Sequence, residues 1–215
     1  MAWECPANSR IFTTSTDMPL ILERQIGTAK KIGVWQITEP IDFFLEQLVQ
    51  ADNPSISRKR LLEQSCSAHL LNTLLKNTVH QHLDKDPNGK PFLKDHPYSV
   101  SFSHSKNMVA CLIDTEGGPA GIDIEHTRES IRSIAPKFVS EKEGLLKKDY
   151  LHFHLVWGAK EVLYKIYSLK ELDFLEHLSV DFQNDIIGHI HKNDYSATYK
   201  LQFEHLDNFI LVWNI

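Results

Sequence analysis

Residues 121–125, Gly-Ile-Asp-Ile-Glu, constrain the fold of this chain more than any other stretch. Ile122 and Ile124 alternate with two carboxylates, and successive side chains of a β-strand point to opposite faces of the sheet. The pattern therefore predicts a strand that buries its isoleucines and projects Asp123 and Glu125 from one face. Their Cα atoms would lie roughly 6.5 to 7 Å apart, so the two carboxyl groups could converge on a hard cation such as Mg²⁺.

A helix is predicted further along the chain, where apolar side chains recur with helical spacing and form one stripe: Leu155, Ala159, Val162, Leu163 and Ile166. Glu161 and Lys165 flank this stripe one turn apart. If the helix packs on the strand, Glu161 becomes a third carboxylate beside Asp123 and Glu125, edged by the ammonium groups of Lys160 and Lys165. Such a pocket suits Mg²⁺ holding a polyphosphate. Taken alone, an Asp-x-Glu strand is more often a solvated face, and a Glu/Lys pair a surface ion pair.

Five motifs in order resemble those of the 4'-phosphopantetheinyl transferase superfamily, in its single-chain, Sfp-type branch. They lie at 88–93 with Gly-Lys-Pro, 102–105 with Ser-His-Ser, 121–125, 138–143 with Phe-x-x-x-x-Glu, and 157–165 with Trp-x-x-Lys-Glu-x-x-x-Lys. The resemblance implies an α+β fold with two similar α/β subdomains in a pseudo-twofold arrangement. Here these would be residues 1–105 and 119–215, the latter carrying the metal site, joined by a hairpin crossing at 106–118.

The resemblance also implies an activity. The chain would transfer the 4'-phosphopantetheine arm of CoA to a serine of an apo acyl or peptidyl carrier protein, with Mg²⁺, and release adenosine 3',5'-bisphosphate. The matching positions make Asp123, Glu125 and Glu161 the metal ligands, and Glu143 and Lys165 the catalytic residues. The CoA-binding candidates are Arg58, Arg60, Lys90, Ser103, His104, Asp123, Lys160 and Lys165.

Two of these residues have a competing structural interpretation. Ser140 and Glu143 form a Ser-x-x-Glu capping box, in which the glutamate only closes a first helical turn. Because glutamine can replace glutamate in the box, Glu143→Gln should keep the melting temperature within a few degrees. As a general base, Glu143 would contribute at least about tenfold in rate. His104, expected at a strand end, could bind a phosphate or simply a backbone carbonyl.

Two other functions remain open at this stage. A CoA-binding protein without transfer activity would keep the phosphate contacts and need no base, and a metal-dependent phosphohydrolase would direct the same carboxylates at water. A Ser–His hydrolase is disfavoured because the chain has no Gly-x-Ser-x-Gly segment.

Composition limits the remaining classes. The formal charge of −5 over 215 residues argues against a general nucleic-acid binder. Three cysteines without paired spacing indicate a reducing compartment, and no apolar run approaches the ~20 residues of a membrane span. We therefore expect a cytoplasmic protein that binds neither nucleic acid nor a membrane. The resemblance implies CoA and a carrier protein as its partners, and we expect a monomer.

The remaining patterns predict individual elements. Strands are expected at 10–17 and 32–38 with a loop at 18–28 between them, and helices at 40–52 and 56–82. A strand at 98–103 precedes a hairpin formed by 108–113 and 121–125, and helical pieces follow at 128–150. Turn residues separate four C-terminal strands, at 177–182, 186–191, 195–204 and 209–214.

Overall fold

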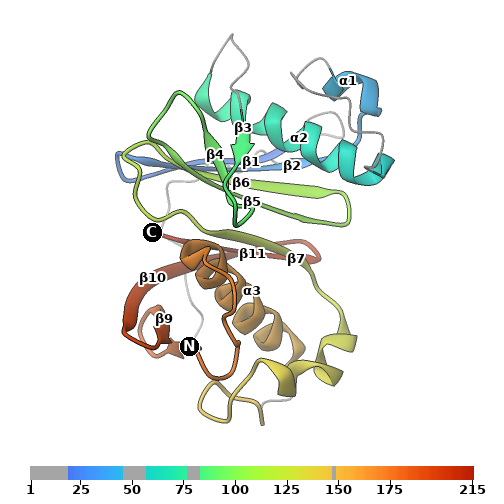
Figure 1. Cartoon of the computed structure of the whole chain (residues 1–215). Helices are drawn as coiled ribbons and strands as arrows, with labels where there is room; N and C mark the ends of the chain where they lie inside the picture. Colours follow the sequence, from blue (N-terminus) through green and yellow to red (C-terminus); the bar gives the residue numbers. More distant parts are fainter. Residues whose placement is uncertain (1–18, 46–56, 77–82, 147–148) are drawn as a thin grey trace.

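The computed structural model describes residues 19–45, 57–76, 83–146 and 149–215. Two antiparallel sheets face each other, and each carries one long helix on its outer side, so the fold is α+β (Figure 1). The expected strand at 10–17 and the end of the helix expected to reach 82 lie outside the described residues. Within these ranges no helix has the length and apolarity needed to cross a membrane.

The six-stranded sheet has the order β1-β2-β6-β5-β4-β3. In that order its strands are Leu20–Ile26, Lys30–Gln36, Met108–Asp114, Ser99–Ser105, Pro91–Leu93 and Leu83–Lys85. Helices α1 (Ile41–Leu45) and α2 (Arg58–Leu75) cover its outer face. Ser57 caps α2 by accepting a hydrogen bond from the Arg60 amide at 3.3 Å, and helix formation over this predicted stretch is confirmed.

The five-stranded sheet has the order β7-β11-β10-β9-β8. Its strands are Ile122–His126, Phe209–Asn214, Tyr195–Leu206, Ile186–Lys192 and Leu178–Phe182. The four strands predicted at the C-terminal end are all confirmed. Two 3₁₀ helices, η1 (Glu129–Ser133) and η2 (Ala135–Lys137), precede α3 (Tyr150–Tyr167), whose apolar stripe packs on this sheet.

The core between the sheets combines the inner faces of both. Ile122 and Ile124 of β7 are fully buried there, as the alternating pattern predicts. Trp213 of β11 joins them, and Ile32 and Val34 of β2 supply the facing layer. The isoleucines thus hold β7 against the first sheet, and the other face of β7 is left for α3.

One sequence expectation for strand pairing is wrong. The hairpin of 108–113 with 121–125 does not form: β6 pairs with β2 and β5, and β7 pairs with β11. The chain therefore passes between the sheets at 115–121, after β6. Asn214 fixes this passage, because its side chain accepts a hydrogen bond from the Gly121 amide at 2.8 Å and donates one to the Pro119 carbonyl at 2.9 Å.

The loop expected at 18–28 is largely strand β1. Its consecutive polar residues hide any strand alternation in the sequence. Arg24 finds its partners in the other sheet, with Glu204 at 2.6 Å and the Trp213 ring centroid at 5.6 Å. Long-range pairing overrides the local pattern here.

Candidate functional site

The carboxylates of β7 face helix α3, as the strand and helix patterns predict. Gly158 allows this close approach: a Cβ atom there would lie 2.8 Å from the Val212 side chain and 3.6 Å from Asp123 Oδ2. Glu161 lies one turn further along α3, and Lys165 lies two turns further along. The strand–helix pairing therefore brings Asp123, Glu161 and Lys165 together.

Asp123 is almost fully buried, and its two oxygens have different surroundings. Oδ1 accepts hydrogen bonds from Lys165 Nζ at 2.7 Å and from Ser103 Oγ at 2.8 Å. Lys165 also donates to the Ile122 carbonyl at 2.8 Å. Oδ2 is buried without a hydrogen-bond partner among the described residues. A buried carboxylate oxygen of this kind is rare, and a cation is a natural partner for it.

The two neighbouring carboxyl groups have raised pKa values. Burial raises the pKa of Glu161 to about 7, and the negative charges of Asp123 and Glu125 add to this while Lys165 opposes it. Burial and the charge of Asp123 also raise the pKa of Glu125, against the opposing effects of Arg128, a hydrogen bond from the Trp157 side chain, and Lys165. Excess negative charge in a partly buried site favours binding of a cation.

These residues fit a metal that is shared with a substrate. In the described part of the chain, no group of three or more His, Cys, Asp or Glu side chains is arranged to hold a metal ion by itself. Mg²⁺, however, usually binds through one or two carboxylates and takes its other ligands from water and phosphates. The free Oδ2 of Asp123 and the nearby Glu125 and Glu161 suit that mode better than a closed protein cage.

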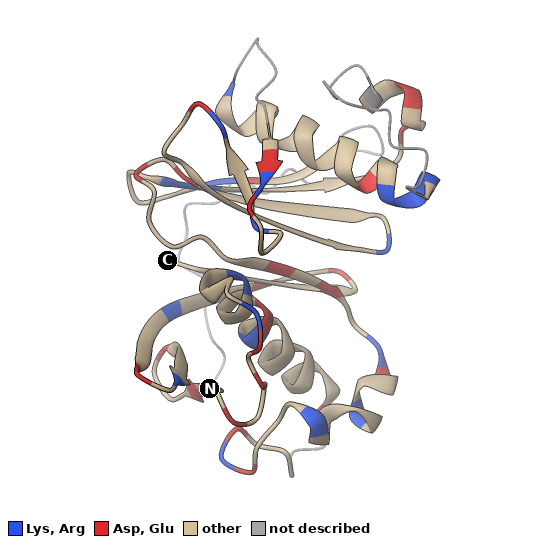
Figure 2. Ribbon diagram, viewed as in Figure 1, with Lys and Arg blue, Asp and Glu red and all other residues tan. Residues whose placement is uncertain are grey.

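A cavity of about 650 Å³ adjoins this site, between α2, strands β3 to β5 and the end of α3. Its lining contains five basic side chains, Arg60, Lys85, Lys90, Lys165 and Lys170, against the two acidic side chains of Glu63 and Asp84. The chain as a whole has a formal charge of −5, and acidic and basic segments occur in both halves of the ribbon (Figure 2). The local basic excess makes this cavity suited to an anionic ligand.

Four of the predicted CoA-binding residues line the cavity: Arg60, Lys90, His104 and Lys165. The side chain of His104 is about half exposed, with Nε2 3.7 Å from Glu63 Oε2. The Lys90 amide donates to Asp86 Oδ1 at 2.8 Å, while burial lowers the pKa of the Lys90 amine and Asp86 opposes that shift. Arg58, at the start of α2, does not line the cavity.

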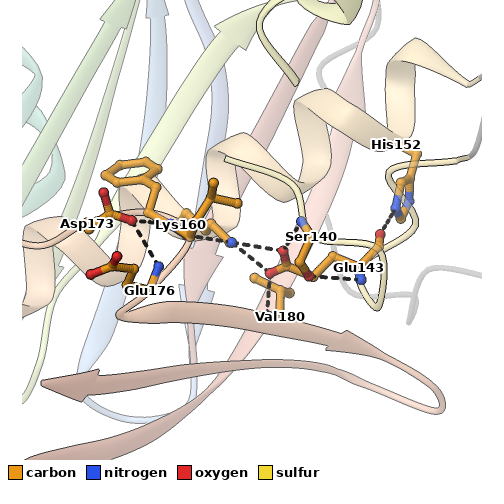
Figure 3. Close-up of polar contacts among 9 residues, drawn as sticks. Ser140, Glu143, His152, Lys160, Asp173, Glu176 and Val180 are labelled. Atoms are coloured by element: carbon orange, nitrogen blue, oxygen red, sulfur yellow. Dashed lines mark hydrogen bonds and ion pairs between the residues drawn. The ribbon is translucent and has the colours of Figure 1, made fainter. Parts of the chain in front are cut away.

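Lys160 and Glu143 form a buried ion pair away from the cavity lining (Figure 3). Lys160 Nζ lies 2.8 Å from Glu143 Oε1 and 2.9 Å from Oε2, and donates to the Phe174 carbonyl at 2.7 Å. The amine has no exposed surface. The sequence resemblance places Lys160 among the CoA-binding residues, whereas in this structure its side chain is internal and bound to Glu143.

Glu143 also forms the predicted capping box. Its Oε2 accepts from the Ser140 amide at 2.8 Å, and its own amide donates to Ser140 Oγ at 3.3 Å. Its Oε1 accepts from the Val180 amide of β8 at 2.9 Å. The segment that follows is turn rather than α-helix, so the carboxylate joins this turn to both α3 and β8 (Figure 3).

The sequence reasoning missed several residues of the cavity. Glu63 lies one turn from Arg60 on α2, and that spacing was visible in the sequence. Lys170 follows the end of α3 with φ 63°, close to Ser168 at φ 57° and Glu171 at φ 58°. Nothing in the local sequence indicates this run of left-handed residues, since none of them is glycine.

No protein-family model matches the chain. Among curated proteins, it is similar to 4'-phosphopantetheinyl transferase Sfp from Bacillus subtilis (strain 168), with 38% identity over 84 residues. The match covers 36% of this chain, which therefore spans 37% of the length of that relative. Together with the carboxylates and the basic cavity, this similarity supports a relationship with the 4'-phosphopantetheinyl transferase superfamily, without identifying a branch within it.

Proposed function

We propose that this protein is an Sfp-type 4'-phosphopantetheinyl transferase that uses Mg²⁺ to transfer the arm of CoA to a serine of an apo acyl or peptidyl carrier protein. The observation that carries the proposal is the basic cavity, whose lining includes Lys165. Lys165 also binds the carboxylate of Asp123, of which only one oxygen has hydrogen-bond partners among the described residues. A polyphosphate in the cavity would lie next to a site suited to Mg²⁺. The partial similarity to Sfp adds independent support. We further propose that the two sheet-and-helix halves are the pseudo-twofold subdomains of that superfamily.

In this proposal Asp123, Glu125 and Glu161 hold Mg²⁺, which when bound neutralises charge on the CoA pyrophosphate. The basic side chains of the cavity bind phosphates as point charges or through hydrogen bonds. Lys165 is central because its side chain, which is 24% exposed, lines the cavity while its amine also holds Asp123 in place. It can therefore contact a phosphate without leaving the carboxylate.

The reaction exchanges the phosphoanhydride bond of the CoA pyrophosphate for a phosphoester bond to the carrier serine. The serine oxygen of the carrier bonds to the phosphorus of the pantetheine phosphate, and the P–O bond to the adenosine-bearing phosphate breaks. Adenosine 3',5'-bisphosphate leaves, and the serine proton passes to a base. The resemblance assigns that base to Glu143, whose carboxylate here accepts bonds from Ser140, Val180 and Lys160.

This engagement of Glu143 favours a second candidate function, a CoA-binding protein without transfer activity. Such a protein needs the phosphate contacts of the cavity and no free base. The two candidates differ in a single readout, which is whether a carrier serine is modified.

Mass spectrometry of several apo carriers after incubation with CoA and Mg²⁺ tests the proposal. We expect a mass increase equal to one phosphopantetheine group. Asp123→Asn and Glu161→Gln should each abolish transfer while the circular dichroism spectrum stays native. Asp181→Asn, which changes an exposed carboxylate on β8 of the same sheet, is the matched control and should transfer normally.

Three results would contradict the proposed transferase function. CoA binding without modification of any carrier would support the second candidate. Breakdown of CoA in the absence of a carrier would indicate a phosphohydrolase. Normal transfer by Asp123→Asn at low Mg²⁺ would remove the metal site from the proposal.

A further inference from the structure

A row of serines on β5 joins the two sheets. Ser101, Ser103 and Ser105 alternate along the strand, so their side chains share the face toward β7. β7 is an edge strand of the five-stranded sheet, and the outward N–H groups of an edge strand need partners. Ser101 Oγ accepts from the Ile122 amide at 3.2 Å, and Ser105 Oγ accepts from the His126 amide at 3.1 Å. These two serines therefore accept hydrogen bonds from the backbone of β7.

Ser103, in the middle of the row, makes a different contact. Its hydroxyl donates to Asp123 Oδ1 at 2.8 Å, a charge-assisted hydrogen bond to a side chain instead of a backbone group. Ser103 is 8% exposed and is absent from the cavity lining, although its neighbours Phe102 and His104 are part of it. Its only hydroxyl proton is committed to Asp123, so it has none to donate to a phosphate.

The consequence for Asp123 is an imposed orientation. A carboxylate rotates freely about its last bond unless its oxygens are held. Lys165 holds Oδ1 through a long side chain that also binds the Ile122 carbonyl. Ser103 holds the same oxygen from the opposite sheet through a short side chain with few rotamers. The pair of donors therefore satisfies Oδ1 and leaves Oδ2 as the oxygen available to a cation.

We infer that Ser103 is a positioning residue, through which the six-stranded sheet sets the orientation of the metal-facing carboxylate on the five-stranded sheet. The inference rests on the proposed function, since it assumes that Asp123 binds Mg²⁺. It replaces the sequence expectation that Ser103 contacts a phosphate of CoA. Hydrogen-bonding partners of metal ligands typically contribute 10- to 100-fold in metal affinity.

The test uses the full chain and Mn²⁺, which takes the same oxygen ligands as Mg²⁺, with isothermal titration in the presence of CoA. Ser103→Ala should weaken Mn²⁺ binding by roughly 10- to 100-fold, while CoA binding measured in EDTA stays unchanged. Ser103→Thr keeps the hydroxyl and should restore Mn²⁺ affinity, and Ser103→Cys, with a weak donor, should fall between. Ser105→Ala is the matched control, because it removes a bond of the same row that does not touch Asp123.

A purely structural role would lower the melting temperatures of Ser103→Ala and Ser105→Ala alike and leave Mn²⁺ affinity unchanged in both. If wild-type protein binds Mn²⁺, that result overturns the inference about Ser103 and leaves the proposed function unaffected. Loss of CoA affinity by Ser103→Ala in EDTA would also overturn it, in favour of a phosphate contact. If wild-type protein binds no Mn²⁺ with CoA present, the metal site of the proposed function fails and the inference fails with it.

Discussion

Replacing Glu143 by glutamine should destabilise the protein by about 3–5 kcal/mol, the usual result of removing one partner from a buried ion pair. The structure gives the reason, because Glu143 is 4% exposed, Lys160 is 0% exposed, and the two charged groups lie 2.8 Å apart. Glutamine offers one acceptor oxygen, while the carboxylate accepts from the two amides of Ser140 and Val180 as well as from Lys160. The glutamine NH₂ group would therefore face another donor.

Thermal unfolding measures this effect. For a domain of this size 1 kcal/mol corresponds to about 2–4 °C, so we expect the melting temperature to fall by roughly 6–20 °C. The capping box alone predicts only about 1 kcal/mol, and Ser140→Ala, which removes the side-chain half of the box, should show that smaller change. Glu143→Gln combined with Lys160→Met should recover much of the loss, since no unpaired charge remains buried.

The pH dependence of Glu143→Gln gives a second check. Burial lowers the pKa of Lys160, and contact with Glu143 is the main effect that opposes this. Without Glu143 the folded-state pKa falls further below the ordinary value of 10.5, so the unfolded chain binds more protons. The free energy of unfolding of the variant should then rise with pH between the lowered pKa of Lys160 in the folded state and 10.5. A melting temperature equal to that of wild type, with transfer reduced tenfold or more, would refute the structural argument and make Glu143 a catalytic base.

Three further predictions follow from the site. The pKa of Glu161 is about 7 in the folded protein against 4.5 ordinarily, so the metal-free folded state binds more protons between these values. Melting in EDTA should show stability falling as pH rises from about 5 to 7, and this trend should be weaker in Glu161→Gln, which leaves only the raised pKa of Glu125. His104→Ala should weaken CoA binding more than the transfer rate at saturating CoA, because a contact made equally in ground and transition states is uniform binding; titration and steady-state kinetics separate the two. Gly121→Ala should cost about 1–3 kcal/mol, since a Cβ there would lie 2.6 Å from the Val162 carbonyl oxygen. A denaturant midpoint equal to that of wild type would show that α3 can move away from β7.

Local patterns determined the elements that carry the site. Alternation predicted that Ile122 and Ile124 are buried and that Asp123 shares a face with Glu125, because side-chain direction in a strand depends only on position. Helical spacing placed Glu161 and Lys165 together for the same kind of reason. The Ser-x-x-Glu spacing likewise predicted the capping box, which needs no contact beyond its own turn.

The tertiary structure alone decided which partner each polar group has. Lys160 and Glu143 are 17 residues apart and were assigned separate roles from the sequence, yet the packing of α3 on the preceding turn buries both as one ion pair. Ser103 and Asp123 are 20 residues apart in different sheets, and their hydrogen bond exists only because β5 lies along the edge of β7. Strand pairing and burial depend on the whole chain, so the sequence determined the chemical groups and their local faces, and the packing of the two sheets determined what those groups bind.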